Sequence, residues 1–388
     1  MGSRVAKQKP ASKSLKPQRR PRRLTPLYSD RYLKPGSSPV SGSRPRKVSS
    51  TQRVSRNWGV ILQKTLAVTT LGVGTGLLII LPFLPPSPSA RSGIGNRPSL
   101  LPNQTAQMSF GRSTDLATQV HFPLRQELSD LQTRVGELAG QYGKGSVGVF
   151  ILDFDTGDYA SWNGMNEFMA ASTIKLPLLT LFFQGVDQGK IELSESLVME
   201  PELMVGEAGN FQYQPPGSQF SALETATQMI TVSDNTATNM IVQRLGGKER
   251  INQRLQQQDL TQTTLNSPLP DLEGTNLTSP VDLANVLIDI EQGEGLSLRS
   301  RDRILRILDG VINDQLLPTG LGKGAAIAHK TGTIGKLLAD AGLVDMPNGK
   351  RYLTVVMVER PYNDPAARTL IEQISREVYD YFGTPNSP

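Results

Sequence analysis

Leucine and valine recur every three or four residues between Leu124 and Leu138. This spacing places side chains on one face of a helix, so we expect an amphipathic helix that ends near Tyr142 and Gly143. A second pattern of the same period predicts a last helix over about residues 364–382. Both predicted helices flank the region in which the other elements lie.

Short apolar runs next to these two helices predict five β-strands. SVGVFILDF and DYASW are separated by a turn at 155–157, and AAIAHKTG, DAGLVDM and RYLTVVMVE follow near the C-terminus, with a turn at 347–349. A mainly helical block, roughly residues 172–315, separates the two groups. The order predicts an α/β (α+β) domain in which terminal helices pack on a five-stranded antiparallel sheet and an all-α lobe lies alongside. A functional site is expected in a cleft between the sheet and this lobe.

An uncharged run of 20 residues extends from Thr65 to Leu84. It has the length that a helix needs to cross a bilayer. A cleaved signal peptide is the competing interpretation, but its charged leader is normally short and its apolar core shorter than this run. We therefore predict an uncleaved N-terminal transmembrane helix within residues 57–84. Because basic flanks stay in the cytoplasm, this single-pass anchor places the N-terminus inside and the domain outside the cytoplasmic membrane.

The positive charge of the chain is concentrated before this run. Residues 1–64 carry 17 Lys or Arg and one acid, Asp30, for a net charge of +16, whereas the rest carries 24 basic and 34 acidic residues, for a net charge of −10. Residues 1–56 therefore read as a disordered cytoplasmic tail attracted to anionic membrane lipid, and without interleaved aromatic residues we expect no nucleic-acid partner. Residues 85–120 read as a Pro/Ser/Gly-rich linker before a domain at 121–385.

Three short motifs carry candidate chemistry: Ser172 to Lys175, Ser233 to Asn235 and Lys330 to Thr333. Residues three apart on a helix share a face, so the Lys175 amine can reach the Ser172 hydroxyl. A lysine whose pKa is lowered by burial or by a second cation, such as Lys330, can accept the serine proton. The chain has no cysteine, which excludes disulfides and a thiolate nucleophile. Ser-x-x-Lys alone is uninformative, but the three motifs in this order are specific.

This set resembles the serine β-lactamase and penicillin-binding protein superfamily, and FMAASTIKLP with the order of elements is most similar to a class A β-lactamase domain. The resemblance implies that Ser172 attacks the lactam or peptide carbonyl and that Lys175 accepts its proton. Ser233 would relay a proton to the departing nitrogen. It implies no metal or organic cofactor. It also implies that the substrate is a β-lactam or the D-alanyl end of a peptidoglycan peptide.

The same resemblance assigns further positions to substrate binding. Asn235 would bind the acyl side chain, and Lys330 with Thr331 would hold the substrate carboxylate. Gly332 would let the substrate approach the strand backbone. The backbone N–H groups of Ser172 and Thr333 would form an oxyanion hole.

Two positions depart from the class A pattern. The family's deacylating glutamate belongs to a Glu-Pro-Glu-Leu-Asn type of segment, and the matching segment here begins with Leu269. A leucine cannot activate water, so Asp271 and Glu273 are the possible substitutes. An arginine common in the strand after the Lys-Thr-Gly motif is replaced by Leu338, and Lys336 is the candidate to supply the missing charge.

Three functions remain open from the sequence. The first is a membrane-anchored class A β-lactamase that hydrolyses β-lactams. The second is a penicillin-binding-protein-like DD-peptidase that acts on peptidoglycan peptides and deacylates slowly. The third is a non-catalytic cell-wall-binding protein, which the intact set of motifs disfavours. The sequence does not indicate an oligomeric state.

Overall fold

The computed structural model describes Gly2 and residues 112–384. The predicted tail, the predicted anchor at 57–84 and most of the predicted linker lie outside these residues. Among the described residues, no helix is both long enough and apolar enough to cross a bilayer.

A five-stranded antiparallel sheet forms the centre of the domain, as the sequence predicts. Its strands are β1 (Val147–Asp153), β2 (Tyr159–Trp162), β7 (Ala326–Ile334), β8 (Leu337–Asp345) and β9 (Arg351–Glu359), in the spatial order β2-β1-β9-β8-β7. Consecutive residues of β1 and β9 are buried because both faces of the sheet are covered. This explains the continuous apolar runs of these strands, since only a sheet with one face in water shows strict alternation.

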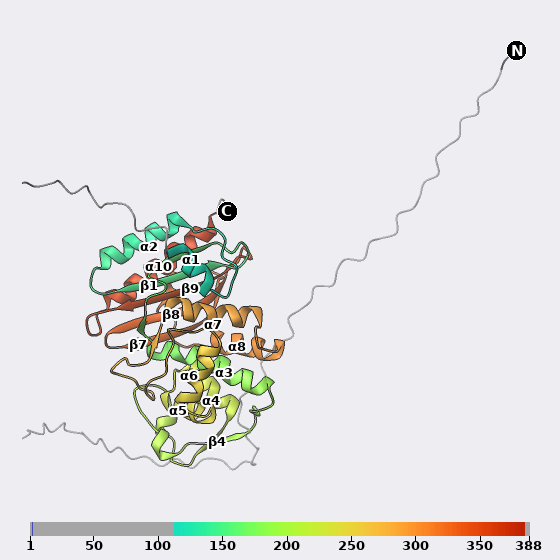
Figure 1. The fold of residues 1–388 in the computed structure, drawn as a ribbon, viewed down its shortest axis with the longest axis vertical. Helices are drawn as coiled ribbons and strands as arrows, with labels where there is room; N and C mark the ends of the chain where they lie inside the picture. The colour runs from blue at the N-terminus through green and yellow to red at the C-terminus, as the bar shows by residue number, and fades with distance from the viewer. Residues whose placement is uncertain (1, 3–111, 385–388) are drawn as a thin grey trace, which may run out of the picture. The chain divides into compact units, whose positions relative to one another are not determined.

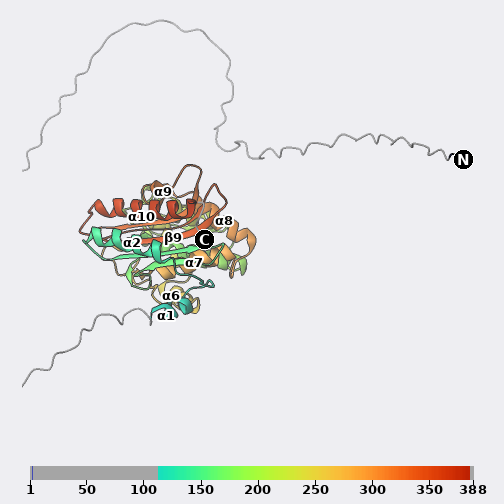
Figure 2. The same cartoon turned by 90° about the horizontal axis from the view of Figure 1, so that it is seen from above.

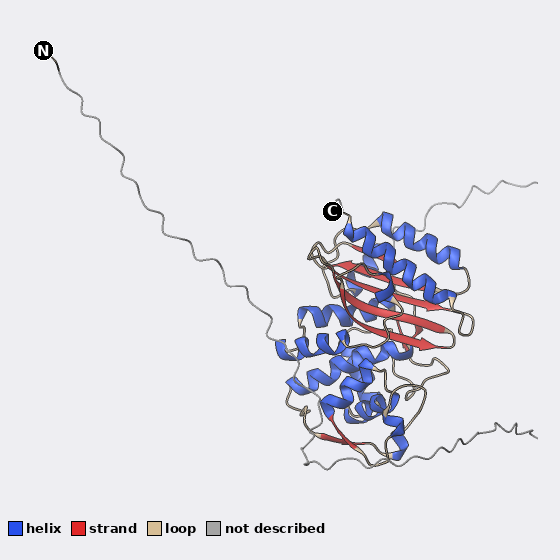
Figure 3. Cartoon of the chain, turned by 180° about the vertical axis from the view of Figure 1, so that it is seen from behind, coloured by secondary structure: helices blue, strands red, loops and turns tan. Residues whose placement is uncertain are grey.

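Two helices pack on one face of the sheet and a helical lobe packs on the other (Figures 1 and 3). The first face carries α2 (Ser129–Tyr142) and α10 (Ala366–Gly383), which lie side by side over the strands in Figure 2. Val149, Ile151 and Val356 point to these helices, whereas Phe150, Leu152 and Val355 point to the lobe. One strand thus contributes alternate side chains to two hydrophobic cores.

The helical lobe is built around α3 (Lys175–Asp187), whose residues 175–185 are all buried. Around it lie α4 (Ala222–Thr231), α5 (Asn235–Arg244), α6 (Lys248–Gln257), α7 (Pro280–Gln292) and α8 (Leu298–Asp309). The short helix α9 (Leu317–Gly320) returns the chain to the sheet. Two-stranded sheets, β3 (Phe168–Met169) with β6 (Leu277–Thr278) and β4 (Ser196–Val198) with β5 (Gln219–Ser221), were not expected from the sequence.

Two differences from prediction occur at the start of the domain. The helix predicted from Leu124 begins only at Ser129, because residues 125–128 run beside β2: the N–H groups of Arg125 and Leu128 donate to the carbonyls of Gly157 and Tyr159. A further helix, α1 (Arg112–Gln119), lies in the stretch expected as linker. Leu116 and Val120 belong to the hydrophobic core between the sheet and the helical lobe. The packed domain therefore begins before residue 121.

Candidate active site

Ser172 lies in the short 3-10 helix η1 (Ala171–Ile174), immediately before α3. The sequence predicts Ser172 and Lys175 on one helix, but Lys175 is the first residue of α3 and Ser172 precedes it in this tighter turn. Ala171 has a φ of +46°, in the left-handed region that non-glycine residues rarely adopt. Such conformations cluster at active sites, where the surrounding structure enforces them. The adjoining helix α3, buried over residues 175–185, lies directly after this segment.

The amine of Lys175 is fully buried against the Ser233–Asn235 motif. Its Nζ donates to the Ser233 carbonyl at 2.7 Å and to Asn235 Oδ1 at 2.8 Å, and it lies 3.1 Å from Ser233 Oγ. Burial lowers the pKa of Lys175 well below its usual value, and the nearby charge of Lys330 lowers it further, while Asp234 opposes the shift. A neutral amine at this place donates two hydrogens and keeps a lone pair to accept a proton. The amine has no hydrogen bond to the Ser172 hydroxyl here, a contact that in many enzymes tightens only with substrate.

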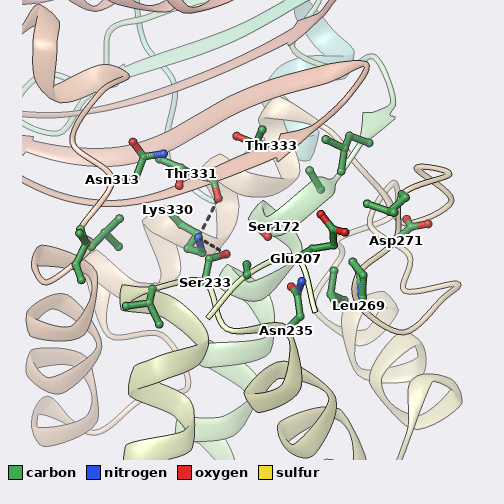
Figure 4. Close-up of a pocket in the computed structure, with 18 of the residues that line it drawn as sticks. Ser172, Glu207, Ser233, Asn235, Leu269, Asp271, Asn313, Lys330, Thr331 and Thr333 are labelled. Atoms are coloured by element: carbon green, nitrogen blue, oxygen red, sulfur yellow. Dashed lines mark hydrogen bonds between the residues drawn. The ribbon is translucent and has the colours of Figure 1, made fainter. Parts of the chain in front are cut away.

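Lys330 approaches the same hydroxyl from the sheet. It lies on β7, the edge strand that faces the cleft, and its Nζ is 3.2 Å from Ser233 Oγ and 2.9 Å from the carbonyl of Thr331. Burial lowers the pKa of Lys330 to about 8, although the charge of Asp340 acts in the opposite direction. Ser233 Oγ therefore lies within hydrogen-bonding distance of two buried amines whose pKa values are both lowered, as Figure 4 shows for Lys330.

The Ser233–Asn235 motif is positioned by the start of α5. Asp234 caps this helix by accepting from the N–H of Ala237 at 2.8 Å, and its second oxygen accepts from the N–H of Phe211 at 2.8 Å. Ser233 has a φ of +57°, which turns its side chain away from the helix toward the two lysines. Capping explains why an aspartate occupies position 234, immediately before the helix.

His329 and Asp340 form a buried pair directly beneath this region. His329 Nδ1 lies 2.9 Å from Asp340 Oδ1, and the other Asp340 oxygen also accepts from the N–H of Leu317. The side chain of His329 therefore contacts Asp340 on the neighbouring strand β8 and does not line the cleft.

Leu269 and Asp271 form one wall of the cleft. The side chain of Leu269 is 4% exposed, and Asn239 fixes its backbone by accepting from its N–H at 3.0 Å and donating to its carbonyl at 2.8 Å. Asp271 accepts from Thr275 Oγ1 at 3.0 Å and from the N–H of Asn276 at 2.6 Å, so both of its oxygens hold the loop together. Glu273 is exposed and does not line the cleft. Neither carboxylate is presented freely beside Ser172.

The structure shows a packing requirement at Gly332 that the sequence did not predict. Gly332 is not among the cleft-lining residues, whereas Thr331 and Thr333 are. A Cβ at position 332 would lie 2.9 Å from Thr173 Cγ2 and 3.2 Å from the carbonyl oxygen of Ala170. Glycine is therefore required for close packing of β7 against η1, the segment that carries Ser172.

The cleft encloses about 770 Å³, which is within the usual range for small-molecule sites. It brings together the predicted residues Ser172, Ser233, Asn235, Lys330, Thr331 and Thr333, and the buried Lys175 contacts two of them, Ser233 and Asn235. Leu338 is buried in the core on the other face of the sheet, and Lys336 does not line the cleft. The sequence did not reveal three further lining residues, Glu207, Tyr362 and Arg368.

Arg368 lies at the start of α10, and its Nη1 donates to Gln315 Oε1 in the loop between α8 and α9. It adds a positive charge to the lining of the cleft, to which Thr331 and Thr333 also belong. No local pattern signals this role, because Arg368 is 38 residues from Lys330 and belongs to an amphipathic helix on which an exposed arginine is ordinary.

The fold and the three motifs in one cleft define a class A-like domain of the serine β-lactamase and penicillin-binding protein superfamily. A model described as the beta-lactamase enzyme family matches residues 129–382, and the chain belongs to this family. Beta-lactamase BRO-1 of Moraxella catarrhalis is 24% identical over 248 residues, which cover 61% of this chain and 79% of that protein.

Solved structures include a more similar protein. PBP-A is 51% identical, with a TM-score of 0.67 over 68% of this chain and 99% of that one. A leucine-to-glutamate mutant of PBP-A, described as an acyl-enzyme complex with penicillin G, is also 51% identical, with a TM-score of 0.66 over the same shares. The inferred ancestral class A β-lactamase GNCA4 is 28% identical, with a TM-score of 0.61 over 65% of this chain and 99% of that one.

Proposed function

We propose that this protein is a penicillin-binding-protein-like serine acyl-transfer enzyme, anchored in the cytoplasmic membrane with its domain outside. It is acylated by β-lactams and by the D-alanyl ends of peptidoglycan peptides, and it deacylates slowly. The observation that carries this choice is Leu269, an apolar residue in the wall of the cleft where class A hydrolases place their general base. Because both Asp271 oxygens are engaged and Glu273 lies off the cleft, efficient β-lactam hydrolysis is the second candidate. The identity with PBP-A supports the same choice.

The acylation step follows from the contacts of the two lysines and Ser233. Ser172 Oγ attacks the carbonyl carbon, and its proton passes to the neutral amine of Lys175. Lys175 contacts Ser233 Oγ, so a proton can continue through this hydroxyl to the departing nitrogen as the carbon–nitrogen bond breaks. The product is an ester of Ser172, with the opened lactam ring still attached or with the terminal D-alanine released.

Binding is assigned to the residues around this path. Lys330, Thr331 and Arg368 attract the substrate carboxylate, and Asn235 binds the acyl side chain. The backbone N–H groups of Ser172 and Thr333 stabilise the oxyanion.

A burst experiment distinguishes the candidate functions. The full-length chain in mild detergent is mixed with a chromogenic cephalosporin, and the colour is followed while a fluorescent penicillin reports covalent label. We expect one equivalent of colour followed by a slow steady phase, with label that persists on the protein, because acylation has its groups in place and deacylation lacks a base. Steady colour without an early burst would favour β-lactam hydrolysis, and neither colour nor label would favour a non-catalytic wall-binding protein.

Acylation is expected to have a bell-shaped pH profile. As the pH falls through the lowered pKa of Lys175, its amine becomes protonated and cannot accept the Ser172 proton, so the rate falls on the acid side. As the pH rises through about 8, Lys330 loses its charge and its attraction for the substrate carboxylate, so the rate falls on the basic side. The second-order rate constant of acylation by penicillin G, measured as a function of pH, reports both groups in the free enzyme.

A matched variant assigns the basic side of this profile. Lys330→Arg keeps the positive charge at high pH, because arginine does not deprotonate in this range. Its profile should therefore remain level above about pH 8, even if the absolute rate is lower. A basic limb that is unchanged in Lys330→Arg would show that another group titrates.

A further inference from the structure

Glu207 lines the cleft, but neither the three motifs nor the acylation step uses it. Its side chain is exposed and its φ is +72°, in the left-handed region. Within residues 112–384 its carboxylate has neither an ion pair nor a hydrogen bond. In the view of Figure 4 it points into the cleft between Ser172 and the loop that carries Leu269 and Asp271.

Asn235 fixes the backbone on both sides of Glu207. Its Nδ2 donates to the carbonyl of Gly206 at 3.0 Å, and its own backbone N–H donates to the carbonyl of Ala208 at 3.2 Å. One residue earlier, Val205 exchanges two hydrogen bonds of 3.0 Å with Thr236 Oγ1. The loop is therefore held on the start of α5, and Glu207 keeps an unfavourable backbone conformation because both of its neighbours are held.

This attachment places Glu207 on the side of the cleft where Asn235 would bind the acyl side chain of the substrate, which we call the acyl side. Asn235 and Asn239 are one turn apart on α5 and so share a face, on which Asn235 holds the Glu207 loop and Asn239 holds Leu269. The cations that line the cleft, Lys330 and Arg368, come instead from β7 and α10. The cleft thus carries an unpaired carboxylate on its acyl side and positive charge where the substrate carboxylate binds.

We propose that Glu207 is a specificity residue that selects acyl donors with a free ammonium group on the acyl side. This inference rests on the proposed function. The natural substrates that match are peptides that end in D-alanyl-D-alanine. Directly before these two residues they carry a diamino acid with a free side-chain amine. A β-lactam with an amine in its acyl side chain presents the same charge, whereas a β-lactam with a neutral side chain does not.

Penicillin G and ampicillin provide a matched pair, because they differ by one amino group in the acyl side chain. Their second-order acylation rate constants are compared for the full-length protein and for Glu207→Gln, at about pH 6.5, below the pKa of an α-amino group. We expect the ampicillin to penicillin G ratio to fall by about five-fold in Glu207→Gln, the size of an exposed ion pair. This difference should shrink at high salt, since salt screens exposed charges. Glu273→Gln removes a carboxylate outside the cleft and should leave the ratio unchanged.

A second pair tests the peptide class. Nα-acetyl-L-lysyl-D-alanyl-D-alanine has a free side-chain amine, and its Nε-acetylated form does not. We expect release of D-alanine to favour the free amine in the native protein and this preference to be lost in Glu207→Gln.

The outcomes separate this inference from the proposed function. If both penicillins acylate the protein but the ratio is the same in Glu207→Gln, Glu207 does not select for an ammonium group and the proposed function stands. If neither penicillin acylates the native protein, both proposals fail. Because glutamine has the shape of glutamate and the side chain is exposed, the variant is expected to fold as the native protein does.

Discussion

Replacement of Ser172 by alanine is expected to abolish covalent labelling by a fluorescent penicillin. Ser172 lies in η1 on the cleft, and it is the hydroxyl one turn before the buried amine of Lys175. Removal of a serine nucleophile lowers the rate of an acyl-transfer enzyme by about 10⁴ to 10⁶-fold. Gel fluorescence and intact mass spectrometry of the full-length chain should both show no adduct.

A control separates loss of the nucleophile from loss of structure. Ser194→Ala removes an exposed serine that does not line the cleft, so its labelling should equal that of the native protein. Ser172→Ala should also unfold at nearly the native temperature, since only one oxygen is removed. An adduct of unchanged yield in Ser172→Ala would show that another residue is the nucleophile.

Replacement of Leu269 by glutamate is expected to speed deacylation of the penicillin ester by about 10² to 10³-fold. General-base catalysis typically contributes this order of magnitude. Leu269 lies in the wall of the cleft with its backbone held at both N–H and carbonyl by Asn239, so a side chain here has a defined direction. The half-life of the fluorescent adduct after a chase with excess unlabelled penicillin measures the rate.

Leu269→Gln is the matched control, because glutamine has the length of glutamate but is not basic. Its adduct should persist as it does in the native protein. Both variants place a polar group at a side chain that is 4% exposed, so both should lose thermal stability, at a cost of about 1–3 kcal/mol. Equal half-lives for Leu269→Glu and Leu269→Gln would show that this position does not contact the attacking water.

The central sheet could be predicted because its signal is local. Each strand is a short apolar run bounded by a turn, and the turns at 155–157 and 347–349 separate paired strands in the structure. The start of α2 was misplaced because the helical period continues into residues 125–128, where hydrogen bonds to Gly157 and Tyr159 favour an extended backbone. The short sheets were not predicted, since two or three residues carry no periodicity.

The candidate site also contains some residues that the sequence could predict and others that it could not. Ser172, Lys175, Ser233 and Lys330 belong to compact motifs whose order along the chain is informative. Glu207 belongs to no motif, and only its attachment to Asn235 brings it to the cleft.

The sequence by itself determined the family, the sheet and the helical lobe, and it predicted the acylation residues, because each of these depends on residue types at short, regular spacings. Only the tertiary structure decided what surrounds Ser172. It showed that Lys175 and Lys330 share the Ser233 hydroxyl, that Gly332 serves the packing of β7 on η1, and that Asp271 is occupied within its own loop. It also brought Arg368 and Glu207 to the cleft from distant segments. Charge and hydrogen bonding act through space, so neighbours that are far apart in the chain become visible only when the chain is folded.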